Sequence, residues 1–271
     1  MEKLIITVAP TGSLPTKKKN PHVPITPDEI IQTGILCEKA GASIIHVHAR
    51  NPVDETASTD FQIFKEIFEG LKQETNLIIQ ISTGGRAGME YEKRSERLLL
   101  KPEMASLTTG SVNFPSSVYA NSPDLISTLA ADMKIHGIKP EIEIFDVSMI
   151  QNAMDLVDKD LVARQVHFDF VMGLKGAIPA TIENLVHLKN SIPKKSTWTV
   201  AGIGAAQLPM CIHAIAMGGH TRVGLEDCIY FQKGELASNE QLVNRIVQIT
   251  TIMSREVATP NEARKILGLQ A

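Results

Sequence analysis

The chain has 271 residues, and 27 Lys and Arg against 30 Asp and Glu give it a net charge of −3. This balance argues against nucleic-acid binding, because sequence-independent affinity for phosphates needs an excess of clustered cations. Hydrophobic residues make up 43% and charged residues 21%, which is typical of a globular protein and excludes a disordered or fibrous one. No apolar run approaches the roughly 20 residues that span a bilayer, so a membrane partner is not expected.

The N-terminus and the cysteines indicate the compartment. Residues 4–9 form a β-branched run that begins at once, without the organisation of a signal peptide. Cys37, Cys211 and Cys228 are widely spaced and odd in number, so they predict neither a disulfide framework nor a CxxC metal or redox motif. Both features favour a cytoplasmic protein.

Short β-branched runs alternate with amphipathic stretches along the chain, which is typical of repeated βα units around a parallel sheet. The expected strands span residues 4–9, 43–49, 77–83, 104–109, 141–146, 168–173, 197–202 and 220–226. The expected helices span residues 27–40, 60–73, 90–100, 123–136, 148–159, 181–190, 207–217 and 238–254. Thr26, Pro27 and Glu29 supply a capping box and a first-turn proline for the first helix.

Eight βα units without a dividing linker predict one domain over residues 1–271, a (β/α)₈ TIM barrel, whose usual size is about 250 residues. The rival is an open doubly wound sheet, which needs a GxGxxG turn after its first strand. Residues 9–15 read Ala-Pro-Thr-Gly-Ser-Leu-Pro instead. A capped extra helix is expected from Thr259 to Leu269, with a role in subunit packing.

Two histidines interrupt the second strand, although a strand buried on both faces should be apolar. His46 and His48 lie two residues apart, so both side chains are expected inside the barrel at its catalytic end. Glu226 ends the eighth strand, and strands two and eight both flank strand one. Two imidazoles and a carboxylate with open positions suit zinc, with iron and cobalt as alternatives.

The fifth strand carries two inward carboxylates, Glu141 and Glu143, between outward isoleucines. Burying an unpaired carboxylate costs several kcal/mol, so each needs a partner, and Arg222 is the natural inward cation. We interpret the deeper Glu141 as part of a structural ion pair. Glu143, nearer the catalytic end, is expected in the site.

The third and fourth strands end in small hydroxyl residues and glycines. Ser82, Gly84, Gly85, Ser106 and Thr108 offer hydroxyl and backbone N–H donors where a carboxylate or oxyanion can dock. Taken singly, such strand endings are usually only turns. They gain meaning beside the histidines and carboxylates of the neighbouring strands.

Taken together, these positions resemble the β-keto acid cleavage enzyme family nearly end to end. The resemblance rests on Thr11-Gly12, His46-Val47-His48, residues 80–85, Lys101-Pro102-Glu103-Met104, residues 140–143, residues 200–204 and Gly224-Leu225-Glu226-Asp227. It implies a zinc-containing TIM barrel, a homotetramer, in which His46, His48 and Glu226 hold the metal.

The resemblance also implies a reaction, in which a β-keto acid and acetyl-CoA give acetoacetate and a new acyl-CoA by a Claisen and retro-Claisen sequence. Asp227 matches the family's base, assisted by Arg222, and Ser82 and Glu143 match residues of the substrate site. Strict alternation aligns Arg222 with Glu226, so an Arg222–Asp227 pair requires a bend or bulge at the strand end.

Two positions depart from the family member that cleaves an amine-bearing β-keto acid. Position 14 is acidic there and Leu14 here, and position 106 is threonine there and Ser106 here. An apolar side chain cannot compensate a cation in a closed pocket. We therefore predict substrates with neutral or apolar tails.

Two other functions are weighed against this one. A metal-dependent amidohydrolase also uses an HxH motif in a barrel, but on its first strand and with further histidines after strands five and six, whereas His167 lies at the start of strand six. A non-catalytic barrel gains nothing from buried charges at one end. The other histidines are interpreted as surface or packing residues. The run Lys17-Lys18-Lys19 is interpreted as a solvated loop with a secondary attraction for CoA phosphates.

Overall fold

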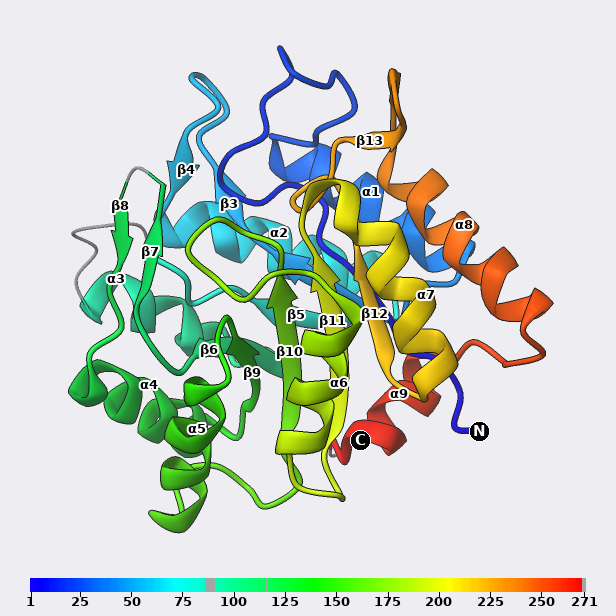
Figure 1. Cartoon of the computed structure of the whole chain (residues 1–271). Coiled ribbons are helices and arrows are strands. Elements are labelled where there is room, and N and C mark those ends of the chain that lie inside the picture. The colour runs from blue at the N-terminus through cyan, green and yellow to red at the C-terminus, as the bar shows by residue number, and fades with distance from the viewer. Residues whose placement is uncertain (86–90, 116, 270–271) are drawn as a thin grey trace.

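The computed structural model describes residues 1–85, 91–115 and 117–269. A closed parallel barrel forms its centre, with the strand order β1-β12-β11-β10-β9-β6-β5-β2, and the predicted TIM barrel is confirmed (Figure 1). The barrel strands are β1 (Ile6–Val8), β2 (Ile44–Val47), β5 (Ile78–Ile81), β6 (Met104–Thr108), β9 (Lys139–Ile144), β10 (His167–Met172), β11 (Thr197–Gly202) and β12 (His220–Val223). Parallel pairing of β1 with both β2 and β12 closes the ring.

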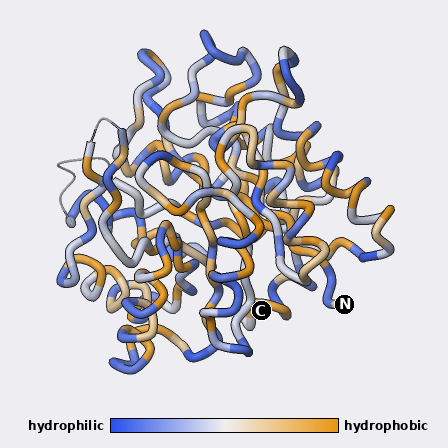
Figure 2. The backbone as a smooth tube through the Cα atoms, in the orientation of Figure 1, coloured by the Kyte–Doolittle hydropathy of each residue, from blue (hydrophilic) through white to orange (hydrophobic). Residues whose placement is uncertain are grey.

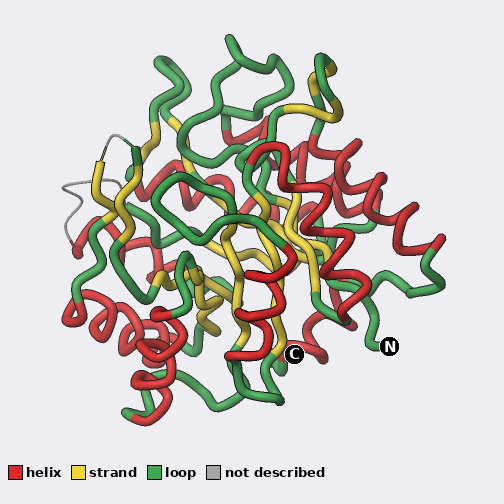
Figure 3. The backbone as a smooth tube through the Cα atoms, viewed as in Figure 1, coloured by secondary structure: helices red, strands yellow, loops and turns green. Residues whose placement is uncertain are grey.

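Helices surround the barrel as an outer layer (Figure 3). They are α1 (Pro27–Ala40), α2 (Phe61–Glu74), α3 (Tyr91–Ser95), α4 (Pro123–His136), α5 (Ser148–Asp158), α6 (Ile182–Ser191), α7 (Gln207–Met217), α8 (Asn239–Ile252) and α9 (Pro260–Leu267), with 3-10 turns η1 (Glu96–Leu100) and η2 (Gly204–Ala206). Three predicted helices, those over residues 27–40, 123–136 and 207–217, have the observed bounds. The helix predicted over 90–100 is divided between α3 and η1, and Glu90 lies outside the described residues. The predicted capping box at Thr26 is present.

Three short hairpins were not predicted from the sequence. They pair β3 (Ala49–Arg50) with β4 (Ala57–Ser58), β7 (Val112–Phe114) with β8 (Ser117–Tyr119), and β13 (Tyr230–Gln232) with β14 (Glu235–Leu236). Each follows the carboxyl end of a barrel strand, so all three extend the catalytic end of the barrel. Strands of two or three residues carry too little alternation to be read from a sequence.

Buried apolar residues fill the layer between strands and helices and one end of the barrel. In Figure 2 hydrophobic residues are frequent along the central strands. Phe168 and Phe170 of β10 belong to the outer layer and are fully buried. At the amino-terminal ends of the strands lies a cluster that we call the barrel floor, formed by Ile5, Ile44, Ile78, Met104, Ala258, Ala263 and Leu267.

The extra C-terminal helix has a place within the chain itself. Helix α9 supplies Ala263 and Leu267 to the barrel floor, so it closes the end opposite the catalytic end. Its N-cap Thr259 forms a capping box with Glu262. In the part of the chain that the structure describes, no helix has the length and apolar character needed to cross a membrane.

Candidate active site

Alternation along the barrel strands brings polar side chains above the barrel floor. On β2, Ile44 belongs to the floor, and His46 lies two residues further and is also buried. Strand β5 repeats this order with Ile78 and Gln80, and His46 and Gln80 are register partners. Nδ1 of His46 lies 2.5 Å from Oε1 of Gln80, which leaves Nε2 available to a metal when Nδ1 carries the proton.

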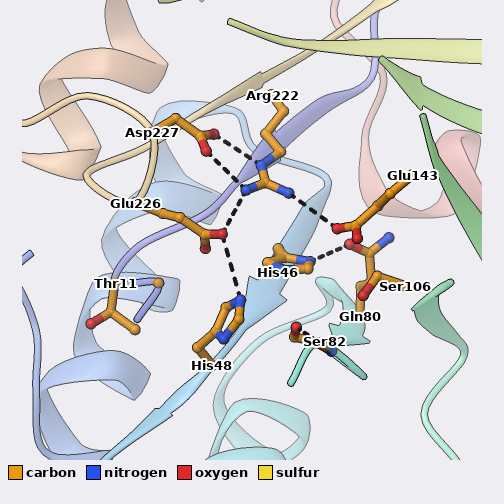
Figure 4. A network of polar contacts seen from close by, with 12 residues as sticks. Thr11, His46, His48, Gln80, Ser82, Ser106, Glu143, Arg222, Glu226 and Asp227 are labelled. Atoms are coloured by element: carbon orange, nitrogen blue, oxygen red, sulfur yellow. Dashed lines mark hydrogen bonds and ion pairs between the residues drawn. The ribbon is translucent and has the colours of Figure 1, made fainter. Parts of the chain in front are cut away.

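His46, His48 and Glu226 come together at the catalytic end (Figure 4). One ligand atom from each lies within 4.8 Å of the others, and Nε2 of His48 is 3.5 Å from Oε1 of Glu226. Burial lowers the pKa of His46 to about 4, so its imidazole is neutral at physiological pH. Burial alone would raise the pKa of Glu226, but Arg222 and both histidines hold it well below its ordinary value.

This set fits a divalent metal by its donor chemistry. Neutral imidazoles and an ionised carboxylate are the ligands of catalytic zinc, which keeps a further position open. Oε2 of Glu226 is buried and accepts no hydrogen bond among the described residues, as expected of an oxygen reserved for a metal. No other group of three potential metal ligands was found in the described chain.

A turn at Gly224 places Glu226 and Asp227. Strand β12 ends at Val223, and Gly224 has a φ of +149°, a conformation that favours glycine. A Cβ at Gly224 would lie 2.0 Å from the carbonyl oxygen of Ala9. This turn is the bend that the Arg222–Asp227 pair was expected to require.

Arg222 lies among four carboxyl groups, which together we call the Arg222 cluster. Its Nε and Nη2 each donate to Asp227 over 2.9 Å, and Nη2 also donates to Glu226 over 2.7 Å. Its Nη1 lies 3.5 Å from Oδ2 of Asp169 and 3.9 Å from Oε1 of Glu143. Burial raises the pKa of Asp227 to about 6, although Arg222 opposes this rise.

The two carboxylates of β9 have different partners. Glu143 lines the pocket, accepts a hydrogen bond from Thr108, and has a pKa raised by burial. Glu141 lies deeper, and its Oε2 is 3.1 Å from Nε2 of His167. Burial would raise the pKa of Glu141, but His167 holds it below its ordinary value.

These contacts correct two expectations. The close partner of Glu141 is the His167 imidazole and not Arg222, because register places Glu141 beside His167. His167 therefore has a specific partner in the barrel interior rather than a general packing role. Its place at the start of β10, below the metal set, is not that of an amidohydrolase ligand.

The hydroxyl residues and glycines at the ends of the third and fourth barrel strands lie at two different depths. Ser82, Gly84 and Gly85 line the pocket, and the N–H of Gly84 donates to Oγ of Ser82 over 3.1 Å. Ser106 and Thr108 are buried and do not line the pocket. Oγ of Ser106 accepts the N–H of Thr83 at 3.3 Å, so Ser106 supports the backbone at the end of the third barrel strand, β5.

The pocket above these groups has a cavity of about 230 Å³. Arg222, Glu143, Glu226 and Asp227 line its polar end. The remaining wall includes Leu14, Phe114, Tyr119, Phe145, Leu174 and Ile203. Phe114 stacks on Tyr119 with ring centroids 5.6 Å apart, and both rings make T-shaped contacts with Phe145.

Asp169 and the aromatic wall were missed by sequence reasoning. Asp169 shares its side of β10 with His167, and register sets it beside Glu143. The alternation His-Phe-Asp-Phe over residues 167–170 carries this signal, but it is lost when the strand is taken to begin at residue 168. Phe114 and Tyr119 come from the unpredicted β7–β8 hairpin, which offered no usable signal.

Comparison with known proteins agrees with this geometry. The model of the family described as beta-keto acid cleavage enzyme matches residues 3–269. The chain is 46% identical to a 3-oxoadipate:acetyl-CoA acetyltransferase of Cupriavidus necator, covering 98% of this chain and 94% of the relative. It is 45% identical to a 3-keto-5-aminohexanoate cleavage enzyme of Acetoanaerobium sticklandii, covering 99% of both.

A solved structure supports the fold independently. The ternary complex of ObcA with a C4-CoA adduct and oxalate superposes with a TM-score of 0.80 and 22% identity, covering 92% of this chain and 68% of that one. This likeness concerns the barrel alone. From the family match and the two relatives, the chain belongs to the β-keto acid cleavage enzyme family.

Proposed function

We propose that this protein cleaves a β-keto acid with acetyl-CoA, giving acetoacetate and a new acyl-CoA, and that it uses zinc. The observation that carries the proposal is the meeting of His46, His48 and Glu226 beside the Arg222–Asp227 pair in one pocket. A metal set next to a buried carboxylate is what proton removal beside a carbonyl group needs. Relatives named as acetyl-CoA transferases support the co-substrate.

The residues divide the chemistry between them. Zinc held by His46, His48 and Glu226 would supply Lewis-acid polarisation of the keto and carboxylate oxygens of the substrate. Asp227 would accept the proton from C2, and Arg222 would hold the Asp227 carboxylate through two hydrogen bonds. Over the whole reaction, C2 bonds to the acetyl carbon as the bond between that carbon and the sulfur of CoA breaks, and the C2–C3 bond then breaks as C3 bonds to the released sulfur. The proton that C2 loses is returned to C2, so the products are acetoacetate and the new acyl-CoA.

The pocket wall supports a neutral or apolar substrate tail. Leu14 and the aromatic residues Phe114, Tyr119 and Phe145 offer no charge. In the described lining the arginines are Arg97 and Arg222, and both donate to groups of this chain, Arg97 to the backbone carbonyls of residues 82 and 93. Neither is therefore aimed at a tail carboxylate, and burying an uncompensated charge is costly.

A substrate panel tests this function. Acetyl-CoA-dependent formation of acetoacetate is measured with 3-ketoacids of similar length whose tails are alkyl, amine-bearing or carboxylate-bearing. The alkyl substrate is expected to give the highest kcat/KM. Equal or faster turnover of 3-keto-5-aminohexanoate or 3-oxoadipate would contradict the tail assignment, and no acetoacetate with any substrate would contradict the function itself.

A matched variant sharpens the panel. Leu14→Glu introduces the charge that an amine tail needs and leaves the metal set untouched. Because Leu14 is 59% exposed, the gain is expected to be modest, about fivefold in relative kcat/KM for the amine-bearing substrate. Leu14→Gln is the control, with the same length and no charge, and should give no such gain.

We also propose that the protein acts as a homotetramer in the cytoplasm. Family membership is what supports the assembly, and the three free cysteines Cys37, Cys211 and Cys228 support a reducing compartment. Light scattering of the purified protein measures the mass of the assembly against the 29.6 kDa chain. A mass of one or two chains would contradict the tetramer.

A further inference from the structure

Asp169 is a buried acid that the proposed chemistry leaves without a role. It lies in the middle of β10, and its neighbours Phe168 and Phe170 pack outward against the helices. Alternation therefore turns Asp169 into the barrel, where it is fully buried. Burying a carboxyl group costs several kcal/mol unless it is well paired, so this position requires a partner.

Among the described residues, the ion-pair partner of Asp169 is Arg222. Oδ2 of Asp169 lies 3.5 Å from Nη1 of Arg222. Within the described residues neither carboxyl oxygen of Asp169 has a hydrogen-bond partner, so its contact with Arg222 is an ion-pair contact. Asp169 thus faces the guanidinium group and has no competing hydrogen-bond partner.

Asp169 contacts Nη1, the guanidinium nitrogen to which Asp227 and Glu226 do not bind. Asp227 takes Nε and Nη2, and Glu226 takes Nη2. For Nη1 the remaining acid is Glu143, which is further away at 3.9 Å and lines the substrate pocket. Asp169 therefore lies against the third nitrogen, and its side chain does not line the pocket.

We propose that Asp169 is a positioning residue that anchors Nη1 of Arg222 and so fixes the guanidinium that orients Asp227. The proposal rests on the proposed function, in which Asp227 takes the substrate proton. What the anchor needs is an acceptor oxygen, which a carboxyl group offers to Nη1 in either protonation state. Asp169 acts through Arg222 and does not touch the substrate.

Loss of the anchor frees the guanidinium to turn toward Glu143. Both hydrogen bonds to Asp227 depend on the plane of the guanidinium, because they form side by side from Nε and Nη2. Misplacing a reacting group by about 1 Å can cost on the order of 100-fold in rate. Since substrate contacts remain, the effect is expected in kcat and not in KM.

Two variants with the same number of side-chain heavy atoms and the same branching as Asp separate anchoring from packing. Asp169→Asn keeps an acceptor oxygen, and Asp169→Leu removes it. We expect D169N to stay within about tenfold of wild type and D169L to have a kcat about 10- to 100-fold below D169N, with the KM of both near that of wild type. Folding and zinc content are checked by circular dichroism and metal analysis. If D169L does not accumulate as folded protein, D169A takes its place.

A double-mutant cycle tests whether the effect passes through Arg222. In an Arg222→Lys background the ammonium group lacks the fork that Asp169 anchors, so D169N and D169L should have the same kcat within about twofold. Glu141→Gln is the control, because Glu141 is equally buried and its close partner is His167. This control is expected to lower stability and to leave kcat within about twofold of wild type.

The outcomes are distinct. Equal kcat for D169N and D169L in the wild-type background overturns the anchor, and so does a difference that persists undiminished beside R222K. A wild-type enzyme that is inactive on every β-keto acid overturns the proposed function instead. A gap between D169N and D169L that closes in the R222K background supports the anchor.

Discussion

The two ends of the barrel use the same strands for different purposes. On β2 the inward side chain is Ile44 near the amino end and His46 near the carboxyl end, and β5 has Ile78 and then Gln80. The lower side chains join the barrel floor, which α9 closes. The upper ones enter a buried polar network. A step of two residues thus separates positions that stabilise the fold from positions that carry the chemistry.

This contrast explains why polar residues are confined to one end. Apolar burial at the barrel floor contributes about 25 cal/mol for each Å² removed from water. The Arg222 cluster instead buries four carboxyl groups around one guanidinium, an arrangement that opposes folding through desolvation. The floor therefore offsets the cost of the site, and substitutions at the two ends should have separable effects.

The largest expected effect is at the metal set. His46→Ala removes a ligand, so zinc content should fall and kcat/KM should drop on the order of 10⁴-fold, because the metal supplies several kcal/mol to the transition state. Metal analysis and the acetoacetate assay measure both. His187→Ala, on the exposed side of α6, is the control and should retain zinc and activity. Full activity of metal-free H46A would refute a zinc enzyme.

The next effect separates the base from the metal. Asp227→Asn keeps the shape of the side chain and removes its ability to take a proton, so kcat should fall on the order of 10³-fold. Zinc content should remain that of wild type, because Asp227 is not in the metal set. Asp54→Asn, on an exposed turn, is the control. A D227N variant with wild-type kcat would remove Asp227 from the mechanism.

A smaller effect belongs to the barrel floor. Leu267→Ala leaves a cavity where α9 meets Ile44, Ile78 and Met104, so the free energy of unfolding should fall by about 3 kcal/mol. Denaturant unfolding measures this change. Well below the unfolding midpoint, kcat should match that of wild type. A large loss of kcat in folded L267A would show that the floor and the site are not separable.

The smallest effect concerns the end of α9. Thr259→Ala removes the N-cap hydrogen bond to Glu262, which should lower the free energy of unfolding by about 1 kcal/mol. Thr259→Ser keeps the hydroxyl group and should stay close to wild type. Activity should not change in either variant. If T259A costs as much as L267A, the helix end rather than its apolar face holds α9 in place.

Much of the fold could be predicted because its signals are local. Helix α1 begins with the capping box at Thr26 and ends at Gly41, and both are legible in sequence. Strand ends were harder to predict. The eighth strand was extended to residue 226, but β12 stops at Val223, because Gly224 turns the chain. The backbone conformation at Gly224 depends on its close contact with Ala9, a residue far away in the sequence.

The site residues could be predicted where the alternation of side chains along a strand decides which of them face the barrel interior. His46 and His48 follow from alternation along the second strand. Glu226 follows from the order of strands in a closed barrel, which brings the end of the eighth strand close to the second. The partner of Glu141 could not be assigned, because register between β9 and β10 depends on the whole ring. Asp169 was missed because the predicted strand began at residue 168, one residue after the start of β10. The register between two strands is thus harder to predict from sequence than the side to which each side chain of one strand points.

The turn after β12 ties the last metal ligand to the base. Glu226 and Asp227 are consecutive residues, and the turn before them is made at Gly224, where any side chain would meet the carbonyl of Ala9. Gly12 closes the turn from the other side, since a Cβ there would lie 2.5 Å from Cγ of Glu226. The metal affinity of Glu226 and the basicity of Asp227 therefore both depend on the conformation of this turn. Directed evolution of this enzyme would have to tune them through surrounding side chains, because backbone changes alter both at once.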